Sequence, residues 1–301
     1  MPQYLIGLLA AFGPPVFHGL SNILDNHLAG SVFKRLAPLI FISSCTGLLL
    51  LPVVFFIDRP QLLAVPFVGI AFLIAALEVL YLYPYYWSLR NTDTSIVAAL
   101  FSLGRFLVPL FAYFLVGEVL HPIQYIGLSV VLLSSAFLTI NIRQLRLNPA
   151  LLLMLLVSAM LALQAVLFKY LFESGVGWGT AVAWVAIFEF VIALVFISFP
   201  ANFREFKTSI FRVVQFGPIF VLNELLGWAG NMTSYFSVFL IPVSVAKTIG
   251  STQPVFVLLF AFFISKKYPR LLREHMGKDG VRKKMFLFAL IIFGVSLAIF
   301  G

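Results

Sequence analysis

Five ionisable side chains lie within long apolar stretches of this sequence, where a charged group needs a physical reason to be present. They are Glu78, Glu189, Glu224, Arg105 and Lys247. A charge at the centre of a bilayer costs about 2.5–3.5 kcal/mol on insertion scales, so such residues bind substrates, carry protons or pair with one another. Arg105 or Lys247 can neutralise a carboxylate or phosphate, whereas Glu78 or Glu224 can bind an ammonium group or carry a coupling proton. Groups of both signs fit a zwitterion such as an amino acid better than a plain cation.

The alternative interpretation is structural. Glu78 and Glu224 can pair with Arg105 and Lys247 between helices and so fix the packing, because buried charges must be paired whether or not they bind anything. For Glu189 the two interpretations are equally supported, since its own apolar stretch offers few polar neighbours.

Polar side chains recur at intervals of three and four residues around these charges, which places them on common helix faces. The candidate substrate-binding residues are Glu78, Tyr85, Arg105, Glu224, Trp228, Asn231, Tyr235, Lys247 and Ser251. Further polar positions on related faces are His18, Asn22, Asp25, Tyr81, Ser95, Ser102 and Ser244. Pro254 follows Lys247 on its stripe and removes a backbone hydrogen bond, and a helix broken there can expose carbonyl groups to a substrate.

The elements that carry these residues follow from composition. The 301 residues are 62% hydrophobic and 10% charged, with a mean hydropathy of +1.07. Soluble globular proteins are about 45–50% apolar and about 25% charged, so a soluble enzyme, a disordered chain and a disulfide scaffold are excluded. A helix needs about 20 apolar residues to cross the hydrocarbon core. Ten such spans are predicted, at about 3–24, 36–57, 65–88, 95–116, 121–141, 149–171, 178–199, 213–236, 242–264 and 284–300.

The ten spans divide into two similar sets of five. Tyr86-Trp87-Ser88 precedes a serine at 95 and 102, and Tyr235-Phe236-Ser237 precedes a serine at 244 and 251, with the same spacing. Because five is odd, the second set must enter the membrane from the opposite side. We therefore expect an all-α integral membrane protein of about ten transmembrane helices, arranged as two inverted five-helix repeats over residues 1–145 and 146–301. Inverted repeats are typical of transporters with a site near the membrane midplane.

Short motifs add a resemblance to a known family. The first copy contains Ala98-Ala99 after a serine, the pair Gly117-Glu118, and Gln124 followed by Gly127. These residues resemble an EamA repeat of the drug/metabolite transporter superfamily. The second copy keeps the helix proline of the family at position 254, although Arg105 stands at that place in the first copy and Lys266-Lys267 replace the Gly-Glu pair. The resemblance covers about 60–140 and 215–300, and implies a ten-helix carrier of small metabolites without a cofactor. Glu118 lies in a short connection beside Gly117 and is expected to cap or anchor the next helix rather than to contact substrate.

The basic residues serve as topology signals. Sixteen of the 20 Lys and Arg residues lie in the odd-numbered connections between the predicted spans. Positive residues concentrate in cytoplasmic connections, so this bias places both termini outside. The family resemblance implies the reverse, with both termini in the cytoplasm.

We therefore expect a secondary transporter, not an enzyme, that moves an amino acid or a similar zwitterion or organic ion across the cytoplasmic (plasma or inner) membrane by alternating access. The expected partners are a small-molecule substrate, the lipid bilayer and a coupling proton, with a homodimer as a further candidate. No nucleic acid, metal ion or cofactor is expected. The alternatives are a flippase for an amphiphilic or lipid-linked intermediate and, less favoured, an integral membrane enzyme. The scattered histidines and the absence of a metal or phosphate-loop motif speak against an enzyme.

Overall fold

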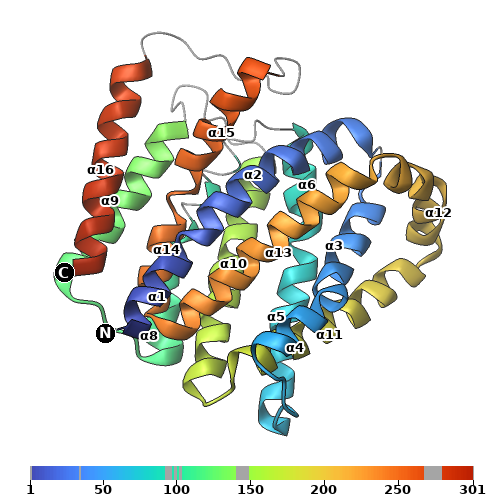
Figure 1. Ribbon diagram of the computed structural model, residues 1–301, viewed down its shortest axis with the longest axis horizontal. Helices are drawn as coiled ribbons and strands as arrows, with labels where there is room; N and C mark the ends of the chain where they lie inside the picture. Colours follow the sequence, from blue (N-terminus) through green and yellow to red (C-terminus); the bar gives the residue numbers. More distant parts are fainter. Residues whose placement is uncertain are drawn as a thin grey trace.

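The computed structural model describes residues 2–33, 35–91, 97, 100–101, 104–139, 149–267 and 280–300, and within these ranges it contains helices and no strand. Figure 1 shows them gathered side by side in one bundle. The helices are α1 (Pro2–Ala11), α2 (Gly13–His27), the π-helix η1 (Leu28–Val32), α3 (Ala37–Leu49), α4 (Leu51–Ile57), α5 (Val65–Leu80), α6 (Leu82–Asn91), α8 (Leu107–Val116), α9 (Pro122–Thr139), α10 (Pro149–Glu173), α11 (Trp178–Ser198), α12 (Pro200–Gln215), α13 (Gly217–Leu240), α14 (Val243–Gly250), α15 (Gln253–Lys267) and α16 (Gly280–Phe300). The predicted all-α class is confirmed.

Proline divides several of the apolar stretches into two helices. Pro14 lies in the first turn of α2, Pro52 in that of α4, and Pro254 in that of α15. Proline lacks a backbone N–H, so it is tolerated in the first turn of a helix and breaks a helix interior. The predicted break near Pro254 is confirmed, because α14 ends at Gly250 and α15 begins at Gln253.

The helices occupy the ranges predicted for membrane spans. Among the described residues, six helical stretches are long and apolar enough to cross a membrane, and a seventh results if the bent pair α12–α13 counts as one span. Three shorter apolar helices lie in the ranges predicted for the fourth, fifth and tenth spans, at Leu107–Val116, Pro122–Ser135 and Phe286–Phe300. The protein is therefore a multi-pass membrane protein, and the count of ten stays a prediction.

The segment between the seventh and eighth predicted spans differs from the expectation of a plain connection. It forms α12, which is turned by 97° from α13. Arg35 donates to Glu205 at 2.9 Å, and Phe41 contacts Phe206 edge-to-face with ring centroids 5.2 Å apart. These contacts hold α12 across the N-terminal end of α3 (Figure 1). The charged residues of α12 lower its hydropathy below that of a membrane span, so hydropathy assigns it to a connection. The helix of the eighth span begins after it, at Gly217.

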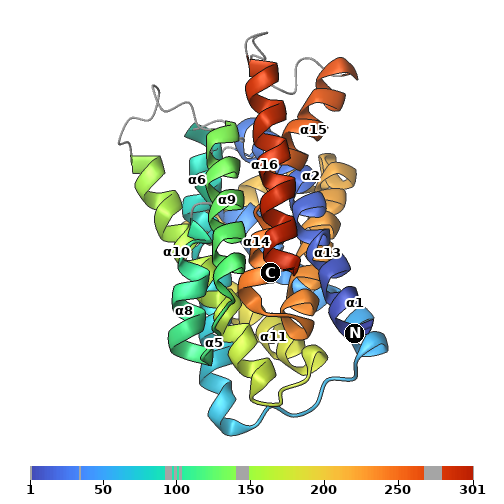
Figure 2. The same cartoon turned by 90° about the vertical axis from the view of Figure 1, so that its left-hand side faces the viewer.

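Two groups of contacts mark the opposite ends of the bundle. At one end the Asp58 carboxylate accepts a hydrogen bond of 2.6 Å from the backbone N–H of Gly179, where α11 begins. At the other end lie the Arg35–Glu205 pair and α12. Figure 2 shows both termini in its lower half, which also contains the connection between α4 and α5. The termini thus lie toward the Asp58 end, away from the basic α12.

The packing of the helices leaves their polar faces in the interior. α13 packs on α2, α11 packs on α3 and α5, and α10 packs on α5, α6 and α8. α9 and α16 form a separate pair at the edge of the bundle (Figures 1 and 2). The central helices therefore come together around the residues predicted to bind substrate.

Candidate functional site

A polar cavity of about 220 Å³ lies between α2, α3, α5, α6, α8, α10, α11, α13, α14 and α15. Three helix breaks border it, since Pro14, Tyr81 and Gly250 are all lining residues next to a break. Broken helices are the usual way in which transporters bring backbone and side-chain polar groups to a site near the membrane midplane. The cavity draws residues from both halves of the chain.

Eight of the nine predicted binding residues line this cavity. They are Glu78, Tyr85, Arg105, Glu224, Trp228, Asn231, Tyr235 and Lys247. Ser251 is buried at the α14–α15 break outside the lining, and its hydroxyl donates to the Lys247 backbone carbonyl at 2.8 Å. Its neighbours Gly250 and Gln253 take its place in the wall. Of the further polar positions, Ser95 and Ser102 lie outside the described residues.

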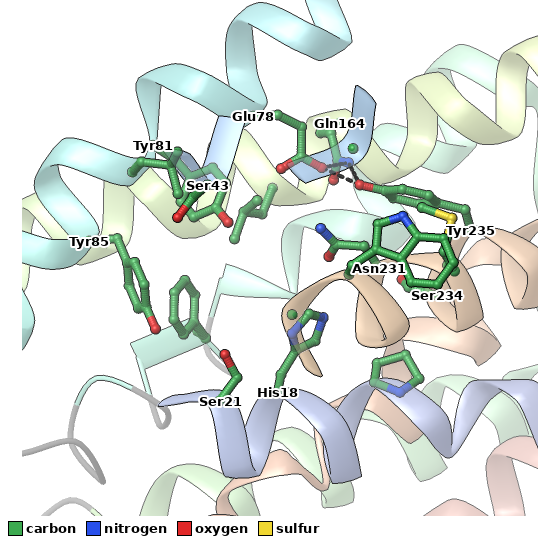
Figure 3. A pocket seen from close by; sticks show the side chains of 18 of the residues that line it. His18, Ser21, Ser43, Glu78, Tyr81, Tyr85, Gln164, Asn231, Ser234 and Tyr235 are labelled. Carbon is green, nitrogen blue, oxygen red and sulfur yellow. Dashed lines mark hydrogen bonds between the residues drawn. The ribbon is translucent and has the colours of Figure 1, made fainter. Parts of the chain in front are cut away.

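The Glu78 carboxylate on α5 is held by neutral groups from two other helices. The Tyr235 hydroxyl of α13 donates to Glu78 Oε1 at 2.5 Å, and Gln164 Nε2 of α10 donates to the same oxygen, as Figure 3 shows. The Tyr235 ring stacks on Phe168 with centroids 4.2 Å apart. This cluster joins the predicted first repeat to the second.

A second network surrounds Asp25 on α2. Its carboxylate accepts a hydrogen bond from the Tyr85 hydroxyl at 2.8 Å and one from Asn223 Nδ2 at 2.7 Å. The Tyr85 hydroxyl also lies 2.9 Å from Asn22 Oδ1, and the Ser21 hydroxyl donates to Asn223 Oδ1 at 3.0 Å. Figure 3 shows Ser21 and His18 projecting from α2 toward the space between Tyr85 and Tyr235.

The Glu224 carboxylate of α13 is bound by α3. Ser43 and Thr46 donate to its two oxygens, each at 2.8 Å. The Ser43 hydroxyl also lies 3.0 Å from the Tyr86 hydroxyl. Glu224 therefore has hydroxyl partners in the apolar second span. The cluster of hydroxyl residues Ser43, Ser44 and Thr46 was the feature of the sequence that could have predicted these partners.

The two cations of the cavity have no carboxylate partner among the described residues. Arg105 Nη2 donates to Gln253 Oε1 at 3.0 Å, and Lys247 Nζ donates to the Ser234 hydroxyl at 2.8 Å. The ion pairs within 4.0 Å in this part of the chain are Arg35–Glu205 and Lys169–Glu173, both outside the cavity. The direct pairing offered as the structural alternative is absent there. Charge of both signs is thus left facing a common space.

Sequence reasoning missed several lining residues or gave them less weight. Glu189, Gln164, Asn223, Gln253, Ser43 and Thr46 all line the cavity. Gln164 was detectable, because an amide in the middle of a 25-residue apolar helix is a polar group without water. Asn223 was adjacent to Glu224, but its face of the helix was not included in the predicted stripe.

Comparisons with known proteins agree with this fold. A solved structure, described only as "Crystal structure of protein", superposes with a TM-score of 0.63 over 100% of this chain and 99% of that chain, at 16% sequence identity. No curated protein matches the chain. The model of the EamA-like transporter family matches residues 5–140, which confirms the resemblance seen in the first half of the sequence. Residues 5–140 of the chain are therefore similar to the EamA-like transporter family.

Proposed function

We propose that this protein is a secondary transporter that moves a small polar metabolite, an amino acid or a similar zwitterion or organic ion, across the cytoplasmic membrane. The observation that carries the proposal is the polar cavity in which Arg105 and Lys247 face Glu78 and Glu224 without a direct ion pair among the described residues. Charges without direct counter-ions in a membrane interior are costly, and a charged substrate supplies the missing partners.

The cavity sets the size of this substrate. A volume of about 220 Å³ corresponds to about seven waters at the volume that water occupies in the liquid. This is enough for a small metabolite and too little for a lipid-linked intermediate to be enclosed. Arg105 and Lys247 would bind its carboxylate, while the acidic wall would bind an amino group or carry a coupling proton.

Alternating access would involve the two predicted repeats, residues 1–145 and 146–301. The Glu78–Tyr235 hydrogen bond and the Glu224–Ser43 hydrogen bond both cross from one repeat to the other. A rocking motion of one repeat against the other around a fixed midplane site would break and remake such contacts. The energy would come from a substrate or proton gradient.

The test is uptake of radiolabelled amino acids and small organic anions into proteoliposomes, with wild type, Arg105→Gln and Arg59→Gln. Arg59 is exposed near the end of α4 and lies outside the cavity, so it is the matched control. We expect saturable uptake by wild type and by Arg59→Gln, and at least a tenfold loss in Arg105→Gln. Full uptake by a folded Arg105→Gln protein would contradict the assigned site. Translocation of a fluorescent lipid without uptake of any small probe would favour the flippase alternative.

A further inference from the structure

Glu189 differs from the other carboxylates of the cavity. Glu78, Asp25 and Glu224 each accept two hydrogen bonds from neutral side chains. Glu189 lines the same cavity from α11, and none of the hydrogen bonds or ion pairs among the described residues involves it. Among the described residues, Glu189 is thus the carboxylate of the cavity with neither oxygen hydrogen-bonded, whereas Glu78 has one bonded oxygen, Oε1, and one without a partner.

The surroundings of Glu189 keep it unpartnered. Its neighbours on the cavity face of α11 are Val182, Val185 and Ala186, which cannot donate hydrogen bonds from their side chains. Across from it on α3, a Cβ atom at Gly47 would lie 3.4 Å from Glu189 Oε2. A Cβ atom at this distance would be in ordinary van der Waals contact with the carboxylate, and Gly47 offers it no side-chain hydrogen-bond donor.

Some hydrogen-bond donors in the cavity wall also lack an acceptor. Arg105 Nη1 and Trp228 Nε1 have no partner among the described residues. A buried donor without a partner costs about 1–3 kcal/mol, and an acceptor group of a bound molecule removes this cost. The wall therefore favours a ligand that has a carboxylate and, on the side toward Glu189, a cationic group.

We propose that Glu189 binds the ammonium group of a zwitterionic substrate whose carboxylate faces Arg105. Glu189 is then the residue that selects substrates carrying an amine. This assigns the ammonium to Glu189 in place of Glu78 or Glu224, whose carboxylates already accept two hydrogen bonds each. The inference rests on the proposed transport function and names the substrate class of the same cavity.

The experiment measures binding of matched probe pairs by calorimetry to purified protein. The two members of each pair have the same side chain and carboxylate, and one of them lacks the amino group. The pairs are alanine and propionate, serine and 3-hydroxypropionate, and leucine and 4-methylpentanoate. Wild type should bind the amino acid of its preferred pair at least tenfold more tightly than the deaminated acid. In Glu189→Gln this ratio should fall to about one, with the affinity for the deaminated acid kept within about twofold. Glu173→Gln, the same change at an exposed position outside the cavity, should keep the wild-type ratio.

Three results would overturn the inference. A wild-type ratio retained in Glu189→Gln removes Glu189 from substrate recognition. Wild type that binds both members equally, or the deaminated acid more tightly, overturns the inference and leaves transport of an organic anion standing. Wild type that binds no probe and transports none in proteoliposomes overturns both proposals. If Glu189→Gln fails to fold, Glu189→Asp is measured instead, because it keeps the charge and withdraws it by one methylene. Its affinity ratio should be below that of wild type, and an unchanged ratio counts against the inference.

Discussion

Glu118 and Val243 are 125 residues apart in the chain, yet the Glu118 Oε2 atom accepts a hydrogen bond of 2.8 Å from the backbone N–H of Val243. Its other oxygen accepts one of 3.0 Å from the N–H of Ser244. Val243 and Ser244 are the first residues of α14, whose free N–H groups carry the positive end of the helix dipole. Glu118 thus caps the helix that presents Lys247 to the cavity. Glu118 therefore has a capping role, but the helix that it caps is α14 and not the next helix in the chain, α9, as was predicted.

Glu118→Ala should destabilise the protein by about 0.5–2 kcal/mol, the usual cost of removing an N-terminal cap. The loss arises because two N–H groups of α14 lose their acceptor. The measurement is the free energy of unfolding in mixed micelles titrated with SDS. Glu173→Ala is the control, since Glu173 is half-exposed and its pair with Lys169 at 3.6 Å is a surface pair worth about 0.3–0.5 kcal/mol. Equal losses in the two variants would show that the cap contributes nothing of its own.

Gly127→Ala should destabilise the α9–α16 pair. A Cβ atom at Gly127 would lie 2.6 Å from both the Ala298 nitrogen and the Gly294 carbonyl oxygen. Both are backbone atoms, so the helices themselves must separate, and overpacking of this kind costs about 1–3 kcal/mol. Thermal unfolding in detergent measures the effect. Gly69→Ala on α5 is the matched control, because a Cβ atom there meets nothing within 4 Å. A melting temperature unchanged in Gly127→Ala would contradict the close approach of α9 and α16.

The membrane spans were predictable because hydrophobic length is a local property of the sequence. The break at Pro254 was predictable for a similar reason, since the missing N–H belongs to one residue. α12 was not predicted, because a hydropathy reading assigns segments rich in charge, such as Arg204 to Arg212, to connections. Its sequence is amphipathic, so predicting this helix required the helical spacing of its apolar residues as well as its mean hydropathy.

The lining of the cavity was predictable on single helices and not between helices. Glu224, Trp228, Asn231 and Tyr235 share a face of α13, and all four line the cavity. Which groups meet across helices depends on the tertiary packing. Glu189 shows this, because the residue opposite it, Gly47, lies on another helix and gives no local signal in the sequence of α11.

The orientation in the membrane can be tested with single cysteines in a Cys45→Ser background, since Cys45 is the single cysteine of the chain. Leu62 is 90% exposed in the connection between α4 and α5, and Thr208 is exposed on α12 at the basic end. Positive residues favour the cytoplasmic side. We therefore expect an impermeant maleimide to label Leu62→Cys in intact cells, and to label Thr208→Cys after permeabilisation alone. The reverse pattern would show that the charge bias misleads and that the termini lie in the cytoplasm.

Glu224→Gln should uncouple transport from an imposed pH gradient. The Glu224 carboxylate has two hydroxyl donors, Ser43 and Thr46, and no cation within 4.0 Å among the described residues. Such a group can bind and release a proton during the transport cycle, whereas the glutamine amide cannot. One coupled proton contributes about 1.4 kcal/mol per pH unit, which equals a tenfold accumulation of substrate. We expect wild-type proteoliposomes to show stimulation up to this size under a gradient of one pH unit, and Glu224→Gln to show exchange of substrate without stimulation. Stimulation retained in a folded Glu224→Gln protein would show that another carboxylate of the cavity carries the coupling proton. Glu78→Gln and Asp25→Asn would then be compared in the same assay.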